Sequence, residues 1–372
     1  MVTAFTVHVP QPEIDDLKER IRKTRWLDAA ESFDWKLGTE KTYLKELANY
    51  WEQQFDWRKV ENKINSFPNY ITKIDTLKVH FLHVKSKNEN AIPLLITHGW
   101  PGSFLEMLKI IPLLTDTFHL VIPSIIGFGF SENKLYNDTD YGFVANIWHK
   151  LMLKLNYQNY GLQGGDLGAG ISIRLAQKHP KNIIGLHLNY ISDSYKPYTT
   201  STNNNEIKEY QEYLKNWNRK EGAYANIQST KPLSLAYGLN DSPIGLCAWI
   251  LEKFEAWSDH NGNIENSFSK DELLANISLY WFTQTIYSSM KIYHGISKNP
   301  LVFAAHDFVK VPVGFAKFPK EIPTPPKSYI EKGLNIIHWT EMKKGGHFAA
   351  FEVPNLLASD LKVFFKKIEK SH

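Results

Sequence analysis

Short apolar runs alternate with longer amphipathic segments in two parts of the chain, from about residue 91 to 192 and from about residue 299 to the end. Runs that are apolar at nearly every position are typical of strands buried on both faces. Segments whose apolar residues recur every three or four positions are typical of helices packed on one face. Strands are therefore predicted at residues 76–84, 91–97, 118–123, 160–163, 184–190, 300–305, 308–315 and 334–339.

Helical segments lie between several of these strands. Residues 148–155 and 169–178 connect predicted neighbours in the sheet. A final amphipathic helix has an apolar face made of Leu357, Leu361, Phe364, Phe365 and Ile368. Alternation of strand, helix and strand indicates βαβ units. We therefore assign the chain to the α/β class, with a mostly parallel central sheet flanked by helices.

Residues 1–90 precede this alternation and are mainly helical in pattern. Ile14, Leu17 and Ile21 follow one another at positions i, i+3 and i+7. A second apolar stripe consists of Leu44, Leu47, Trp51 and Phe55. Aromatic side chains at helical spacing usually pack in a core. We expect an N-terminal helical region that packs on the core domain.

A long segment interrupts the α/β alternation at residues 193–298. It begins with a polar loop and continues as helices rich in Tyr and Trp. An insertion of this kind is typical of a lid over the carboxyl ends of the strands. The predicted organisation is an N-terminal region (1–90), the first part of the core (91–192), the lid (193–298) and the second part of the core (299–372).

Composition excludes several classes of function. The 372 residues carry a net charge of only +4, with acidic and basic residues interspersed, so no basic stripe for nucleic acid is apparent. A single cysteine, Cys247, excludes an intrachain disulfide and a multi-cysteine zinc site. No apolar run approaches the roughly 20 residues that a membrane span needs. We expect a soluble cytoplasmic protein without a metal, a cofactor, a nucleic-acid partner or a membrane anchor.

The most informative motif is Gly164-Gly165-Asp166-Leu167-Gly168, which lies between an apolar run and a helical segment. Small residues two positions before and after a central side chain are typical of the nucleophile elbow of α/β-hydrolases. Here the central residue is Asp166. A carboxylate is anionic at neutral pH and can attack a strained or halogenated carbon without a base. The alternative is an Asp that caps a helix in a glycine-rich turn.

Two further segments fit this chemistry in chain order. His98-Gly99-Trp100-Pro101-Gly102 follows a predicted strand, where such a loop supplies one backbone donor of an oxyanion hole. The predicted donors are the N–H groups of Trp100 and Leu167, and the alternative is a Gly/Pro turn with a core Trp. His347 lies in the loop that holds the catalytic base in this order. His98, His119, His187 and His338 are expected to be structural.

An acid that orients His347 should lie between the elbow and that histidine. Asp307, after predicted strand 300–305, and Glu321, after strand 308–315, both qualify. Spacing alone does not choose between them. The glycines at 161–170 also permit a dinucleotide-binding loop, but the acidic residue that such a site needs is not found at the required distance.

Together these residues identify a resemblance to a known family. The chain resembles the epoxide hydrolases of the α/β-hydrolase fold, in particular the microsomal-type branch that includes juvenile hormone epoxide hydrolases. The matching segments extend along nearly the whole chain, at 17–26, 50–58, 98–103, 127–131, 164–166, 227–232, 239–243, 314–321 and 345–352.

The resemblance implies roles that spacing does not. It favours Glu321 as the acid, and it matches Tyr224 and Tyr293 to two lid tyrosines that hold and protonate the epoxide oxygen. Leu167 and Ala169 depart from the Trp and Ser that are common in this branch, which puts the substrate range in doubt. The membrane anchor of microsomal members is not matched.

The expected function is therefore cofactor-independent hydrolysis of a small hydrophobic epoxide to a vicinal diol, in a detoxification role. Asp166 would form an alkyl ester, and His347 with Glu321 would activate the water that cleaves it. The alternatives are a haloalkane dehalogenase with the same Asp nucleophile, and a non-catalytic binding protein on this scaffold. The oligomeric state stays open, with a homodimer among the options.

Overall fold

The computed structural model of the 372-residue chain describes residues 1–28, 34–135, 139–198 and 205–370. Within them a nine-stranded sheet has the order β1-β2-β3-β5-β4-β6-β7-β8-β9. The strands from β5 to β9 pair in parallel, whereas β1, β2 and β3 extend the sheet by antiparallel pairing. The fold prediction of a mostly parallel α/β sheet is thereby confirmed.

The strand bounds follow the apolar runs of the sequence. They are β1 (Val2–Ala4), β2 (Asn69–Ile74), β3 (Leu77–Val84), β4 (Ile92–Thr97), β5 (Phe118–Pro123), β6 (Tyr160–Gly164), β7 (Ile183–Leu188), β8 (Val309–Lys317) and β9 (Leu334–Glu341). Every residue of the central strand β6 is buried. Burial on both faces explains why this strand is a continuous apolar and small-residue run rather than an alternating one.

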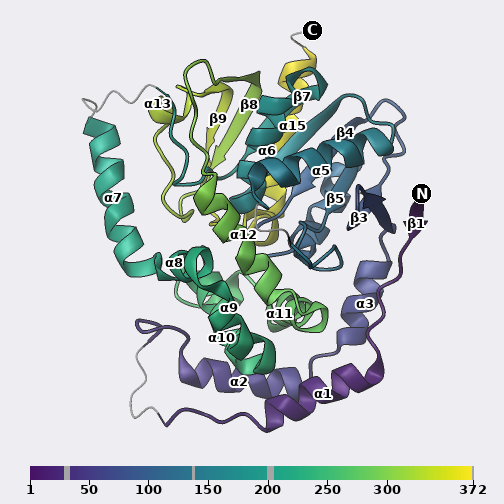
Figure 1. Cartoon of the computed structure of the whole chain (residues 1–372), viewed down its shortest axis with the longest axis vertical. Helices are drawn as coiled ribbons and strands as arrows, with labels where there is room; N and C mark the ends of the chain where they lie inside the picture. The colour runs from purple at the N-terminus through teal and green to yellow at the C-terminus, as the bar shows by residue number, and fades with distance from the viewer. Residues whose placement is uncertain (29–33, 136–138, 199–204, 371–372) are drawn as a thin grey trace.

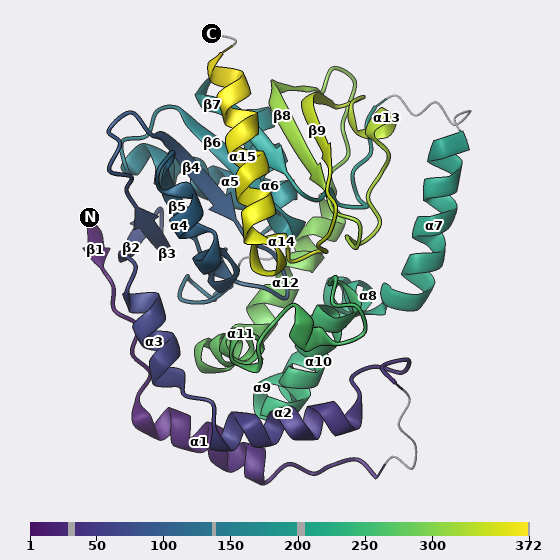
Figure 2. The same ribbon diagram turned by 180° about the vertical axis from the view of Figure 1, so that it is seen from behind.

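Helices cover both faces of the sheet (Figures 1 and 2). One face carries α5 (Tyr141–Lys154) and α6 (Asp166–Lys178). The opposite face carries α4 (Ile111–Leu114) and the terminal helix α15 (Pro354–Glu369), with the 3₁₀ helix η1 (Phe104–Lys109) and α14 (Ala349–Glu352) nearby. The apolar stripe predicted for the last helix is the buried face of α15.

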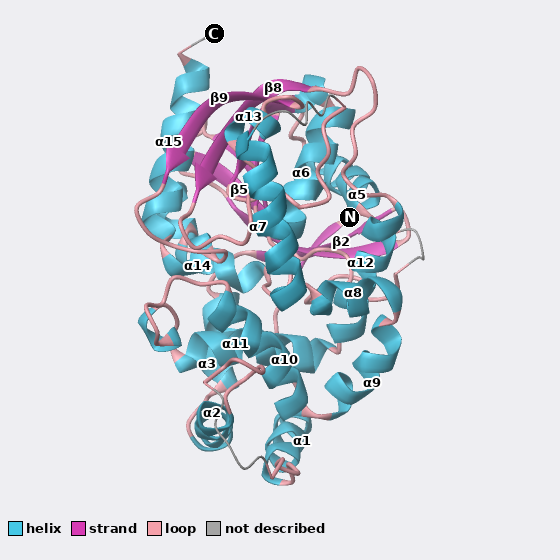
Figure 3. Ribbon diagram, turned by 90° about the vertical axis from the view of Figure 1, so that its left-hand side faces the viewer, coloured by secondary structure: helices cyan, strands magenta, loops and turns pink. Residues whose placement is uncertain are grey.

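The lid lies between β7 and β8 in the sequence, and the part of it that the structure describes contains six α-helices. They are α7 (Asn205–Glu221), α8 (Ala223–Thr230), α9 (Pro232–Asp241), α10 (Pro243–Ala256), α11 (Lys270–Thr283) and α12 (Ile286–Lys298). Figures 1 and 3 show most of them between the sheet and the N-terminal helices α1 (Gln11–Arg22) and α2 (Lys41–Gln53). Contacts of α10 and α11 with α1, α2 and α3 (Trp57–Asn65) join the N-terminal helices to the lid.

The structure corrects two predictions of local structure. Residues 300–305 are not a strand, because Val302 makes only an isolated bridge to Lys196 and is 45% exposed. The N-terminal region contains more than the one strand predicted at 76–84, since β1 and β2 also join the sheet. No helix in the described parts of the chain is long and apolar enough to cross a membrane.

Glycines in three neighbouring strands let α15 lie close to the sheet. A Cβ at Gly161 would lie 2.5 Å from Cζ of Phe365, and one at Gly185 would lie 2.5 Å from Cδ1 of Ile368. At Gly314 a Cβ would lie 2.7 Å from the Phe364 ring. Real side chains do not approach so closely, so the glycines set the distance between helix and sheet.

The Gly161→Ala substitution should therefore destabilise the fold. We expect it to lower the free energy of unfolding by about 1–3 kcal/mol, because the added methyl group overpacks the contact with Phe365. Gly238→Ala is the matched control: Gly238 lies inside α9 with no atom within 4 Å of an added Cβ. That change should raise stability by about 0.5–1 kcal/mol. Urea unfolding of both variants measures the difference, and equal stability would contradict this packing account.

Candidate active site

Asp166 lies at the sharp turn between β6 and α6, where the sequence predicts a nucleophile elbow. Its φ of 46° is in the left-handed region, which is uncommon for a residue other than glycine. Close packing holds this turn: a Cβ at Gly99 would lie 2.2 Å from Oδ1 of Asp166, and one at Gly168 would lie 2.0 Å from the Thr97 carbonyl oxygen. The helix-capping alternative is wrong, because Gly165 occupies the N-cap position.

The carboxylate of Asp166 has a different partner on each oxygen. Oδ1 accepts a hydrogen bond of 2.7 Å from the backbone N–H of Trp100. Oδ2 lies 3.3 Å from Nε2 of His347. The Asp166 side chain is 13% exposed. The second predicted donor residue, Leu167, is buried and lines the cavity that opens in front of the carboxylate.

His347 is held between two carboxylates. Its Nδ1 lies 2.5 Å from Oε1 of Glu321, and both side chains are only 2% exposed. Burial alone would lower the pKa of His347. The negative charge of Glu321 and the hydrogen bonds to Asp166 and Glu321 outweigh that effect, so the pKa lies well above its usual value. The two carboxylates thus favour the protonated imidazole, whereas burial raises the pKa of Glu321.

The structure brings Glu321, and not Asp307, to the histidine. Oδ2 of Asp307 accepts a 2.8 Å hydrogen bond from the backbone N–H of Ala304, in a local turn. The strand predicted before Asp307 is absent, so the order of elements that made it a candidate does not exist. Glu321 follows β8, and its Oε1 also accepts from the backbone N–H of Ile322.

The loop that carries His347 is fixed by a carboxylate that sequence reasoning did not single out. Glu352, on α14, accepts hydrogen bonds from the backbone N–H groups of Gly346, Phe348 and Asp259. The backbone N–H of His347 donates to the Trp257 carbonyl oxygen at 2.9 Å. An acidic residue five positions after His347 was the available signal, but its role depends on how α14 folds back onto the loop.

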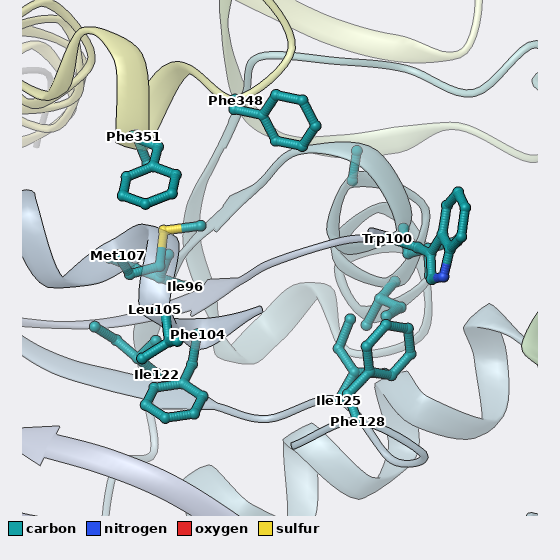
Figure 4. Close-up of a cluster of buried hydrophobic side chains, with 14 of the residues drawn as sticks. Ile96, Trp100, Phe104, Leu105, Met107, Ile122, Ile125, Phe128, Phe348 and Phe351 are labelled. Carbon is teal, nitrogen blue, oxygen red and sulfur yellow. The ribbon is translucent and has the colours of Figure 1, made fainter. Parts of the chain in front are cut away.

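Buried rings surround this loop and the loop after β4. Figure 4 shows Trp100 on one side of the cluster, Phe104 and Met107 on η1, and Phe348 and Phe351 near the His347 loop and α14. All five side chains are at most 5% exposed. Rigid apolar packing of this kind limits the movement of the loop that carries His347 and of the loop after β4, whose Trp100 N–H binds Asp166.

The lid places Tyr224 and Tyr293 opposite Asp166. Both tyrosines line a cavity of about 220 Å³ together with Asp166 and Leu167. The Tyr224 ring is stacked on Trp100, with 5.4 Å between ring centroids, and meets the Tyr293 ring edge-on at 6.0 Å. Burial is the main reason why the pKa of each phenol lies well above its usual value. Nearby charges, including that of Asp166, raise the pKa of both phenols further. Both hydroxyl groups therefore keep their protons.

Other aromatic residues of the site were not found from the sequence. Tyr190 and Trp257 contact the His347 ring edge-on, at centroid distances of 5.5 and 5.2 Å. Tyr190 also lines the cavity, with Tyr141 and Trp217. Among so many aromatic residues no local pattern distinguishes these four from ordinary core residues.

The remaining histidines named in the sequence have structural partners. Nε2 of His98 accepts from the backbone N–H of Ile125, and burial lowers the pKa of His98 to about 4. His187 and His338 both contact the Asp360 carboxylate of α15. His119 accepts a hydrogen bond from a backbone N–H in the adjacent loop. None of these four lines the cavity in front of Asp166.

Two family models match this chain. The family model described as "Epoxide hydrolase N terminus" matches residues 2–107, and the one described as "alpha/beta hydrolase fold" matches residues 92–220. The chain is 40% identical to a putative epoxide hydrolase of Stigmatella aurantiaca, covering 99% of this chain and 85% of that protein.

Solved structures are similar over the same length. The Aspergillus niger epoxide hydrolase superposes with a TM-score of 0.87 and 31% identity, over 99% of this chain and 97% of that one. The juvenile hormone epoxide hydrolase of Bombyx mori superposes with a TM-score of 0.88 and 29% identity, over 100% and 95% of the two chains. The chain therefore belongs to the epoxide hydrolase family of the α/β-hydrolase fold.

Proposed function

We propose that this protein hydrolyses epoxides to vicinal diols through an alkyl ester on Asp166. The observation that carries the proposal is the position of one carboxylate between a backbone N–H, an imidazole and a cavity lined by two phenols. An anionic nucleophile, a base and two proton donors are the groups that this two-step reaction needs.

In the first step, Oδ2 of Asp166 attacks a carbon of the epoxide ring. A new C–O bond forms to Asp166, and the bond from that carbon to the ring oxygen breaks with its electron pair. Tyr224 and Tyr293 hold the ring oxygen, and one of them gives it a proton. Oδ1 stays in its hydrogen bond with the Trp100 N–H and becomes the carbonyl oxygen of the ester.

The second step depends on the loss of a negative charge in the first step. Esterification neutralises Asp166, so one of the two negative charges that raise the pKa of His347 is lost. The imidazole then gives up its proton more readily, and the phenolate left by the first step takes that proton by way of solvent. The neutral imidazole can take a proton from the attacking water, while Glu321 keeps it oriented. Water attacks the ester carbonyl carbon. The N–H groups of Trp100 and Leu167 stabilise the tetrahedral anion, an effect of about 10²- to 10³-fold per donor.

The cavity supports an apolar substrate. Its walls include rings of Tyr141, Tyr190 and Trp217 besides the two lid tyrosines, and it measures about 220 Å³. Two phenols facing the nucleophile suit an oxygen leaving group that must be protonated. A halide needs no proton, so this pair favours epoxides over the haloalkanes of a dehalogenase.

The His347→Gln variant should trap the ester. We expect Asp166 to be alkylated at a near-normal rate while hydrolysis slows by about 10²- to 10⁴-fold, because the water loses its base. Mass spectrometry of the intact protein and of the peptide containing Asp166 should show the added mass of the epoxide. Asp166→Ala is the control without a nucleophile. A variant that never gains mass but still makes diol would contradict the proposal, and halide release from haloalkanes would favour the dehalogenase alternative.

Loss of a lid phenol should slow ring opening and leave ester hydrolysis nearly unchanged. We expect Tyr224→Phe and Tyr293→Phe each to slow ester formation by about 10-fold or more, and the double variant by about 10²- to 10⁴-fold, since it has no acid left. Tyr213→Phe is the matched control, because Tyr213 is a lid tyrosine that is 58% exposed. Stopped-flow single turnovers separate the two steps, and equal slowing of both would contradict these roles.

Removal of the Glu321 charge should move the acid limb of ester hydrolysis to lower pH. Glu321 raises the pKa of His347, whereas burial lowers it. The Glu321→Gln variant should therefore have a lower pKa at His347. Hydrolysis needs neutral His347, hence its rate should begin to fall only at a more acidic pH. The plateau rate should also drop by about 10²-fold or more, because the ring loses its orienting partner. Single-turnover pH profiles in which the acid limb stays at the same pH, or moves to higher pH, would contradict this role.

A further inference from the structure

A buried lysine that the mechanism above does not use lies beside one of the two lid phenols. Lys253 is on α10, and its side chain is only 6% exposed. Its ammonium lies over the Tyr224 ring, 4.9 Å from the ring centroid, and over the Trp257 ring at 5.6 Å. A lysine is seldom buried so completely unless its charge is paired.

The ion pair of Lys253 explains only part of this placement. Glu252, the preceding residue, lies 2.5 Å from the ammonium and is itself 20% exposed. Glu221 of α7 also interacts electrostatically with Lys253. Both carboxylates could also form an ion pair with a lysine whose side chain is exposed at the surface of the lid, so ion pairing alone does not require a buried lysine. The stem of Lys253 instead extends inward and brings the charge onto an aromatic ring of the cavity.

We infer that Lys253 is a positioning residue that acts through Tyr224, by stabilising the phenolate that forms when Tyr224 gives its proton to the epoxide oxygen. This inference rests on the proposed function. The atoms balance within the first step: the O–H bond of Tyr224 breaks, the proton moves to the former ring oxygen, and the electron pair stays on the phenol oxygen.

The surroundings of Tyr224 make such help necessary. Burial and the charges of Asp166 and Asp193 oppose ionisation of this phenol, and the hydrogen bond with Tyr293 offsets them only in part, because the pKa of Tyr224 still lies well above its usual value. The rings of Trp100 and Trp257 pack against Tyr224 at 5.4 and 5.1 Å and are themselves uncharged. Lys253 is the cation placed on this ring. An ammonium attracts the face of a neutral phenol moderately and that of a phenolate more strongly, so its effect increases as the proton leaves.

The two phenols are therefore not equivalent. The Tyr293 ring meets the rings of Trp100 and Tyr224 edge-on, at 6.0 Å in each case, whereas Tyr224 has the ammonium on its ring. We assign the proton transfer to Tyr224, and Tyr293 holds the ring oxygen in place by a hydrogen bond.

Single turnovers of Lys253→Met test this assignment. Ester formation should slow by about 10- to 30-fold, as expected for loss of a desolvated cation–π contact, while ester hydrolysis stays within about twofold of wild type. Lys253→Arg keeps the charge and should recover most of the rate. Lys270→Met is the matched control: Lys270 is a lid lysine that also lies over a tyrosine ring, that of Tyr50, and pairs with a glutamate. It should change neither step.

Double variants show whether Lys253 acts through Tyr224. In a Tyr224→Phe background, Lys253→Met should add little further slowing of ester formation, because no phenolate forms there. In a Tyr293→Phe background its full effect should persist. Equal slowing of both steps by Lys253→Met, or the same effect in both backgrounds, would overturn the inference and leave Lys253 a packing residue.

A second variant keeps the test decisive if Lys253→Met does not fold. Glu252→Gln removes the countercharge of the ammonium, so ester formation should become about twofold faster or more; an unchanged or slower rate would count against the inference. Wild-type protein in the same assay separates the two proposals. If it forms no ester on Asp166, the proposed function fails; if it does and Lys253→Met behaves as wild type, only the role of Lys253 fails.

Discussion

The contact between the Asp166 carboxylate and the His347 imidazole is the constraint on which the rest of the site depends. Oδ2 of Asp166 lies 3.3 Å from Nε2 of His347, and the turn that carries Asp166 is closely packed. Gly99 and Gly168 leave room for that turn, and the Trp100 N–H fixes one carboxylate oxygen. The loop of His347 is fixed independently, by Glu352. The two loops follow different strands, so the sheet itself sets the distance between carboxylate and imidazole.

The proposed mechanism uses this contact as an electrostatic switch. Before the reaction the two carboxylates raise the pKa of His347, which favours the protonated ring over the free base. Formation of the ester removes one of those charges, and the base is produced only once there is an ester to cleave. On the lid side, Tyr224 lies between a Trp100 stack and a buried ammonium. The sheet thus provides the nucleophile and base, and the lid provides the acid.

The sequence predicts the parts of the fold that depend on local pattern. Residues 118–123 are found as a strand with unchanged bounds because they form a continuous apolar run. Residues 300–305 have a similar run but pair with the backbone of Lys196 alone, through one isolated bridge, so Leu301 and Phe303 are buried in a loop. Strand β2 was missed because its sequence, NYITKI, is neither a continuous apolar run nor a regular alternation of polar and apolar residues.

The candidate site divides in the same way. Asp166 and His347 stand in glycine-rich turns with a fixed chain order, so spacing was enough to find them. Spacing did not distinguish Glu321 from Asp307 as the acid. The family resemblance alone pointed to Glu321 and to the two lid tyrosines. Lys253 lies inside an apolar helix with no motif around it, and only its contact with the Tyr224 ring reveals it.

One turnover in heavy-oxygen water, with enzyme in excess, tests the covalent step most directly. Label should appear in the Asp166 carboxylate and not in the first diol; label in that diol would contradict an ester on Asp166.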